Sequence, residues 1–186
     1  MDQPVLVVDL DGTLIHTDML HESALKLFRD RPLDTLRIPL WLSRGKAVLK
    51  EQLASRTHVD PKTLPYNTAL LSWLKSQKSE GRRLVLCTAS DRSIADGIAR
   101  HLELFDEVMA SDGTLNLAGP QKAQALVARF GDKGFDYAGN SEADLAVWIA
   151  DPGEEERRHR AIARDGQTYA PHWQRWADQD LGRSID

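Results

Sequence analysis

The chain has 186 residues, a formal net charge of −4 and a single cysteine, Cys87. This length predicts one domain of ordinary size, with a core large enough to need no disulfide framework. One cysteine excludes an intramolecular disulfide and a Cys-based zinc site, and the weakly acidic balance gives no general nucleic-acid footprint. No apolar run approaches the roughly 20 residues of a membrane span, and the N-terminus lacks a signal-peptide pattern. We therefore expect a soluble, cytoplasmic domain whose oligomeric state the sequence leaves open.

Short apolar runs alternate with helical patterns along the chain. Residues 4–8 and 84–87 are apolar and rich in branched side chains, as in strands buried on both faces of a parallel sheet. Weaker strand candidates are 105–109 and 134–138, and helical patterns cover 67–80, 92–104, 121–130 and 143–149. This order predicts an α/β fold, with a Rossmann-like parallel sheet flanked by helices.

Residues 17–65 interrupt this alternation. They read as two or three helices punctuated by prolines, and they are too many for a simple crossover helix. We expect a small helical cap inserted after the first strand, with 1–16 and 66–150 forming the core domain. Residues 26–56 carry eight Lys or Arg and only three acids, which fits either a solvated surface or a basic lid over an anionic substrate.

The tail, residues 151–186, differs from both parts. The charge run at 154–160 predicts a solvated helix face. Tyr169, Trp173 and Trp176 follow in a polar segment, where they either pack back on the core or contact a partner.

The segment with the clearest chemistry is Asp9-Leu10-Asp11-Gly12-Thr13, directly after the first apolar run. Ligands of parallel sheets bind beyond the carboxyl ends of the strands, and strand geometry aims Asp9 and Asp11 the same way. Two adjacent carboxylates favour a hard cation such as Mg²⁺. Asp9 is then a candidate nucleophile toward phosphorus, and Asp11 a candidate acid and base. The alternative without a function is that the segment forms an ordinary turn. A calcium-binding loop is excluded, because apolar residues follow where its pattern requires further acidic ones.

This segment resembles the first motif of the haloacid dehalogenase (HAD) superfamily, and further motifs extend the resemblance over residues 5–149. Thr88 ends the second apolar run, Lys122 begins a later helix, and residues 137–144 read Tyr-Ala-Gly-Asn-Ser-Glu-Ala-Asp. The resemblance implies that Thr88, Ala89 and Lys122 bind the phosphoryl group. By itself, a Thr at a strand end is usually a turn residue, and a Lys at a helix start is usually exposed.

The resemblance also implies a Mg²⁺ site. Its ligands would be Asp9, the backbone carbonyl of Asp11, Asn140 and Asp144. Asn140 stands where Asp is commoner, and its amide oxygen ligates Mg²⁺ with one negative charge less. Glu142 is an alternative carboxylate.

The place of the insertion is similar to that in the phosphoserine phosphatase-like branch, where a Glu and an Arg contact the substrate. Glu22 and Arg56 match them by rough position, and surface roles are equally open. Residues 9–18, 39–46, 64–67 and 135–141 resemble, more narrowly, HAD domains fused ahead of UbiA-type polyprenyl transferases, in which Asn140 is the usual residue. That likeness implies a phosphosugar or prenyl-linked phosphate as substrate, and association with a membrane prenyltransferase.

Together these features predict a Mg²⁺-dependent phosphatase that hydrolyses a small phosphomonoester through an aspartyl-phosphate. Asp11 disfavours carbon–halogen cleavage, because the dehalogenase branch lacks this second Asp. A phosphomutase or phosphotransferase would use the same residues. A non-catalytic binding module for a membrane prenyltransferase is the alternative of another class.

Overall fold

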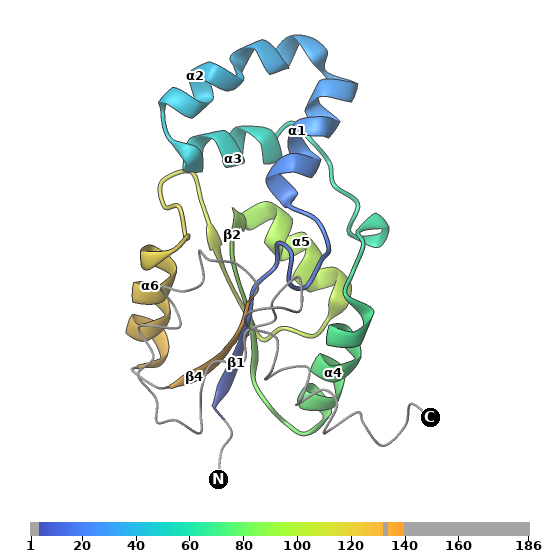
Figure 1. Cartoon of the computed structure of the whole chain (residues 1–186), viewed down its shortest axis with the longest axis vertical. Helices are drawn as coiled ribbons and strands as arrows, with labels where there is room; N and C mark the ends of the chain where they lie inside the picture. Colours follow the sequence, from blue (N-terminus) through green and yellow to red (C-terminus); the bar gives the residue numbers. More distant parts are fainter. Residues whose placement is uncertain (1–3, 132–133, 140–186) are drawn as a thin grey trace, which may run out of the picture.

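Four parallel strands form one sheet in the order β3-β2-β1-β4 in the computed structural model, which describes residues 4–131 and 134–139. Helices cover both faces of this sheet (Figure 1). The elements in chain order are β1 (Val5–Val8), α1 (Met19–Asp30), η1 (Pro32–Arg37), α2 (Ile38–Ser43), α3 (Lys46–Ala54), η2 (Pro61–Thr63), α4 (Thr68–Ser79), β2 (Leu84–Asp91), α5 (Arg92–Leu102), β3 (Glu107–Ser111), α6 (Pro120–Phe130) and β4 (Phe135–Ala138). The predicted α/β fold with a parallel sheet is confirmed.

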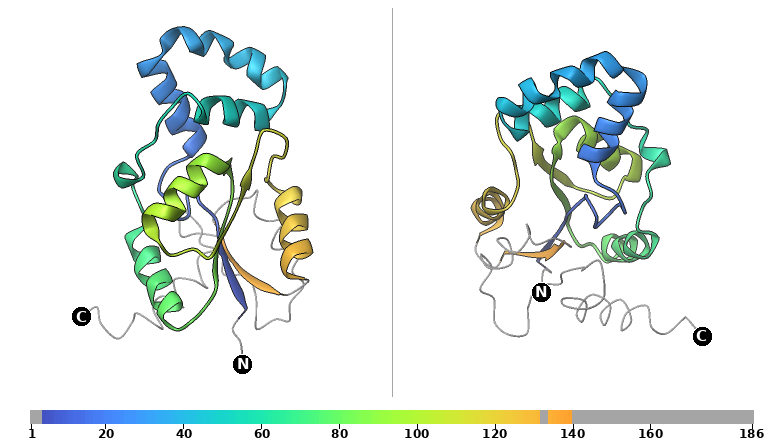
Figure 2. Two further views of the ribbon diagram at one scale, coloured as in Figure 1. Left: turned by 180° about the vertical axis from the view of Figure 1, so that it is seen from behind. Right: turned by 45° about the horizontal axis from the view of Figure 1, so that its top comes forward.

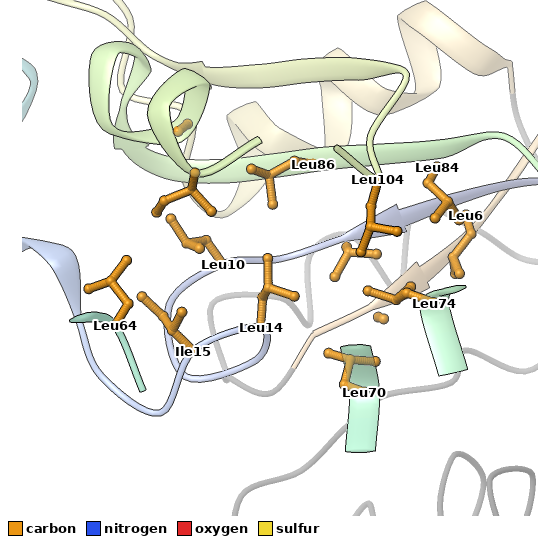
Figure 3. Close-up of a cluster of buried hydrophobic side chains, with 14 of the residues drawn as sticks. Leu6, Leu10, Leu14, Ile15, Leu64, Leu70, Leu74, Leu84, Leu86 and Leu104 are labelled. Carbon is orange, nitrogen blue, oxygen red and sulfur yellow. The ribbon is translucent and has the colours of Figure 1, made fainter. Parts of the chain in front are cut away.

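The central strand β1 divides its side chains between two cores. Leu6 and Val8 belong to a cluster that includes residues of α4 and α5, and part of this cluster is drawn in Figure 3. Val7 instead packs with Leu126 of α6 and Phe135 of β4. Because successive strand residues face opposite sides, the uninterrupted apolar run of β1 supplies both layers.

The helical insertion comprises α1, η1, α2 and α3 and lies beyond the carboxyl ends of the strands (Figures 1 and 2). It has a small core of its own, made of Leu27, Trp41, Leu49 and Leu53. This core explains why a segment without strands holds its shape, because α1, α2 and α3 each bury apolar side chains against the others.

The two ends of the insertion are joined by backbone hydrogen bonds. His16 N donates to Pro65 O at 2.9 Å, and Asn67 N donates to Leu14 O at 2.9 Å. The chain therefore leaves the sheet region and returns to it at one place, which we call the stalk (residues 14–16 and 65–67).

The predicted elements agree with the observed ones in type, and they differ at their ends. Strand β2 runs to Asp91, four residues beyond the predicted 84–87, and β3 begins two residues later than predicted. The helices predicted over 67–80, 92–104 and 121–130 are confirmed as α4, α5 and α6. The helix predicted at 143–149 and the tail at 151–186 lie outside the described residues. Across residues 4–131 and 134–139, none of the helices combines the length and the apolar character that crossing a membrane requires.

One buried cation ties the amino-terminal side of the sheet together. Arg82 donates to Pro4 O and to Gln77 Oε1, each at 2.9 Å, and it forms an ion pair with Asp136 of β4. Its side chain is almost completely buried, so these partners replace the water that a guanidinium otherwise binds.

We expect Arg82→Leu to lower the free energy of unfolding by about 2 to 4 kcal/mol, because it leaves the partners of a buried cation without it. Arg83→Leu is the matched control, since Arg83 is half exposed and pairs with Glu107 near the surface. Its cost should stay below about 1 kcal/mol. Urea unfolding followed by circular dichroism measures both, and equal losses would contradict this account of Arg82.

Candidate active site

Asp9 lies at the carboxyl end of β1, where its backbone N–H donates to Ala138 O at 2.8 Å. Val7 packs against α6, and residues two apart along an extended chain face the same side of the sheet. Asp9, two residues after Val7, therefore faces the same helix. Lys122, in the first turn of α6, donates from Nζ to Asp9 Oδ1 at 2.8 Å. Both side chains are at least nine-tenths buried, so this is an ion pair largely shielded from water.

Lys122 has a second oxygen partner. Its Nζ donates to the Tyr137 hydroxyl of β4 at 2.9 Å. Tyr137 was not predicted as part of the site. It lies on the predicted strand 134–138, but only the structure shows that this strand pairs with the one that leads to Asp9.

A tight turn follows Asp9 and depends on Gly12. Gly12 has a φ of +74°, a conformation that side chains other than glycine adopt only with strain. Within this turn Thr13 N donates to Leu10 O, and Leu14 N donates to Asp9 O, both at 3.3 Å. Strand β1 has already ended at Val8, so strand periodicity does not extend from Asp9 to Asp11, and the two carboxylates contact different elements.

Asp11 accepts hydrogen bonds from three directions. Its Oδ1 accepts from the backbone N–H of Met19, at the start of α1, at 2.7 Å. Its Oδ2 accepts from Ser90 Oγ at 2.7 Å and from Thr88 Oγ1 at 3.3 Å, both at the end of β2. Burial raises the pKa of the Asp11 carboxyl above its ordinary value, and the hydrogen bonds oppose that rise. A raised pKa favours the protonated form, which is the form that donates a proton.

The end of β2, residues 88–91, is fixed by side-chain hydrogen bonds. Thr88 is completely buried, and its Oγ1 accepts from Ser90 N at 2.9 Å. The carbonyl of Ala89 accepts from Ser111 Oγ at 2.7 Å, and Asp91 caps α5 by accepting from Ser93 N at 2.9 Å. This strand end lies at a helix N-terminus, which is a favourable place for an anion.

Lys50, a cation of the insertion, contacts the end of β2. From α3, its Nζ donates to Ala89 O at 2.6 Å and to Asn116 Oδ1 at 2.9 Å. Burial lowers the pKa of Lys50, while the charges of Asp11 and Asp18 act to raise it. The sequence analysis missed Lys50, because it is one of eight cations in 26–56 and no spacing distinguishes it from the others.

The insertion approaches the sheet closely at this point. A cavity of about 10 Å³ lies between the two parts, and its lining includes Met19, Ser23, Lys50 and Ser90. This volume corresponds to about one water molecule. Glu51 follows Lys50 on α3, and a Cβ atom at Gly113 would lie 2.5 Å from its carboxylate oxygen, so a side chain there would force Glu51 to move.

Two predicted substrate-binding residues have partners within the insertion. Glu22 accepts from Thr17 Oγ1 at 2.7 Å and lines a separate cavity of about 300 Å³ between α1 and residues 59–65. The Arg56 guanidinium stacks over the Trp41 ring, 4.8 Å from its centroid. Their roles toward a substrate stay predictions.

The predicted catalytic set is thus partly brought together. Lys122 contacts Asp9, and Thr88 contacts Asp11. The catalytic and phosphate-binding roles of these residues stay predictions. Asn140, Glu142 and Asp144 lie outside the described residues. Inside residues 4–131 and 134–139, the structure contains no cluster of three or more His, Cys, Asp or Glu side chains suited to a metal. Asp9 and Asp11, the described residues among the predicted ligands, carry hard oxygen atoms of the kind that fits the chemistry of Mg²⁺.

Comparison with known proteins agrees with this geometry. The family model for haloacid dehalogenase-like hydrolases matches residues 6–148, and the chain therefore belongs to this family. The uncharacterized protein y4nM of Sinorhizobium fredii is 46% identical over 149 residues. That match covers 80% of this chain and 28% of y4nM, so the chain spans less than a third of this relative.

Solved structures share the fold at low sequence identity. A Bordetella pertussis protein of unknown function has a TM-score of 0.63 at 17% identity, covering 98% of this chain and 97% of its own. A probable phosphoserine phosphatase from Vibrio cholerae has a TM-score of 0.60 at 13% identity, covering 99% and 68%. A substrate-bound phosphoserine phosphatase has a TM-score of 0.58 at 12% identity, covering 89% and 94%. The predicted superfamily is confirmed, while the narrower likeness to domains fused with UbiA-type transferases stays a prediction.

The contacts of Lys50 give a test of how firmly the insertion is held. We expect Lys50→Met, which keeps the apolar stem and loses both hydrogen bonds, to make amide exchange in residues 46–54 and 112–117 about tenfold faster. Hydrogen–deuterium exchange by mass spectrometry measures this. Lys46→Met, on the exposed side of the same helix, is the control and should leave both segments unchanged. Unchanged exchange in Lys50→Met would show that these contacts do not hold the insertion.

Proposed function

We propose that this chain is a Mg²⁺-dependent phosphatase that hydrolyses a small phosphomonoester through an aspartyl-phosphate intermediate. The observation that supports the proposal best is the buried Lys122–Asp9 pair at the end of β1, two residues before a carboxyl group held by Met19, Ser90 and Thr88. One carboxylate is paired with a cation, and burial favours protonation of the other. This division suits a nucleophile beside an acid.

In the first step, a carboxylate oxygen of Asp9 attacks the phosphorus atom, and the bond from phosphorus to the ester oxygen breaks. Asp11 donates its proton to that oxygen, so the product leaves as a neutral alcohol. The enzyme then holds an acyl phosphate on Asp9 and an ionised Asp11. The hydrogen bonds from Ser90 and Thr88 to Asp11 favour this ionised form.

In the second step, Asp11 removes a proton from water, and the resulting hydroxide attacks phosphorus. The bond between Asp9 and phosphorus breaks, which releases inorganic phosphate and returns Asp11 to its protonated form. Proton and charge balance over the cycle, because Asp11 gives one proton and recovers one.

Positive charge and fixed donors would bind the phosphoryl group. Lys122 lies against Asp9, so its ammonium is placed to offset the charge that spreads over the phosphoryl oxygens. Thr88 and Ala89, at the end of β2, lie close to the N-terminus of α5, where backbone N–H groups favour an anion. Asp9, the Asp11 carbonyl, Asn140 and Asp144, with Glu142 as an alternative ligand, would hold Mg²⁺. The ion would supply further positive charge beside the phosphoryl group.

We further propose that residues 17–65 act as a cap that controls access to the site. Lys50 of α3 contacts Ala89 and Asn116, so this segment lies close to the carboxyl end of β2, where a cap would open and close over the substrate. Motion about the stalk would break the Lys50 contacts and free its ammonium for the substrate. Glu22 and Arg56 are further proposed substrate contacts, and a phosphosugar or a prenyl-linked phosphate is the proposed substrate class. Association with a membrane prenyltransferase is part of the same proposal.

We expect Asp9→Asn to abolish phosphate release, because an amide is a poor nucleophile and forms no acyl phosphate. The assay is Mg²⁺-dependent release of phosphate from a panel containing phosphosugars, phosphoserine and a prenyl phosphate. Asp30→Asn, an exposed carboxylate at the end of α1, should retain activity.

The same assay tests the alternatives. Movement of phosphate to a second carbon, without release, would indicate a phosphomutase. A folded protein that turns over no member of the panel and binds no Mg²⁺ would favour the binding module instead.

The role of Asp11 as an acid is tested by varying the leaving group. We expect Asp11→Asn to slow aspartyl-phosphate formation from an alkyl phosphate about 100-fold more than from p-nitrophenyl phosphate, whose phenolate leaves without a proton. Rapid-quench measurement of the burst phase gives both rates. Equal slowing of the two esters would show that Asp11 does not act as the acid.

A further inference from the structure

The insertion exposes a group of large apolar side chains. Seven large hydrophobic residues are exposed in the described part of the chain, and six of them belong to α1, η1 and α2. These six are Leu25, Phe28, Leu33, Leu36, Leu40 and Leu42, and we call them the tip surface. Leu33 and Leu36 are 81% and 78% exposed, so they contribute little to the folded core.

The order of these residues along the helices places them in pairs. Leu25 and Phe28 are three residues apart on α1, and Leu33 and Leu36 are three apart on η1, a spacing that puts each pair on one side of its helix. Helix η1 packs against both α1 and α2, which makes the three elements neighbours. These elements form the end of the molecule opposite the described N-terminus (Figure 1).

Lys and Arg residues alternate with these apolar residues along the chain. Residues 25–46 contain six Lys or Arg and two acids, in a chain whose net charge is −4. Asp34 is paired with Arg31 at 3.4 Å and Arg37 at 3.6 Å, so one acid is shared by two cations. Arg44 and Lys46 extend the exposed cationic side chains to the start of α3.

We propose that the tip surface docks on a lipid bilayer that contains anionic phospholipids. Leucine and phenylalanine side chains would enter the boundary between headgroups and acyl chains, while the Arg and Lys residues that alternate with them contact lipid phosphates. A second copy of this chain fits less well, because face-to-face contact would bring two cationic surfaces together. The proposal does not depend on the phosphatase activity, since neither Asp9 nor Lys122 takes part in it.

Vesicle co-sedimentation of the full chain tests the proposal. We expect binding to phosphatidylcholine vesicles that also contain phosphatidylglycerol, at least about tenfold weaker binding to phosphatidylcholine alone, and weakening by added salt. The double variant Leu33→Asp/Leu36→Asp should reduce binding at least about tenfold, since it places charge where apolar contact is needed. Leu115→Asp is the matched control, an exposed leucine outside the insertion, and should bind like the unmodified chain.

Three outcomes would overturn the proposal. One is no binding to either vesicle, and another is equal binding of Leu33→Asp/Leu36→Asp and the unmodified chain. The third is a dimer in analytical ultracentrifugation that this double variant dissociates, in the absence of vesicle binding. Arg29→Gln/Arg44→Gln provides an independent variant that leaves the apolar residues unchanged, and its binding to anionic vesicles should also fall.

Discussion

The ion pair between Lys122 and Asp9 is the contact on which the rest of the site depends. It joins residues 113 positions apart, and both side chains are almost completely buried. A buried carboxylate without a cation would be strongly disfavoured. The pair therefore requires α6 to pack beside β1 in the position that brings Lys122 to Asp9. That position brings Tyr137 of β4 to the same ammonium group. The same packing of α6 on the sheet therefore fixes the positions of Asp9, Lys122 and Tyr137.

The sheet was predictable because its signals are local. The apolar runs at 4–8 and 84–87 and the helical spacing between the strands require no knowledge of the rest of the chain. The end of β2 was not predictable in this way. Residues 88–91 are polar, and they continue the strand because β3 pairs with Thr88 and Asp91 across a register shift. A tertiary contact decides their conformation, and such contacts leave no local pattern.

The candidate site divides along the same line. Asp9, Asp11, Thr88 and Lys122 were predictable because they follow strands or begin a helix at the sheet edge where ligands bind. Lys50 and Tyr137 were not, since each reaches the site through packing of its element. Lys50 depends on how α3 lies over Ala89 and Asn116, and no spacing in the sequence reports that orientation. Residues of an insertion that complete a site are therefore the hardest to predict.

The stalk has a consequence for how such a protein changes during evolution. The two segments of the stalk are hydrogen-bonded to each other, Leu14 with Asn67 and His16 with Pro65. The insertion therefore leaves the core and returns to it at adjacent points. A segment joined in this way can vary in length or be exchanged for another without moving the strands that carry the carboxylates. The insertion also has its own small core, so its helices pack on one another without side chains of the sheet. The carboxylates at the edge of the sheet and the helices of the insertion are thus separately replaceable parts of one chain.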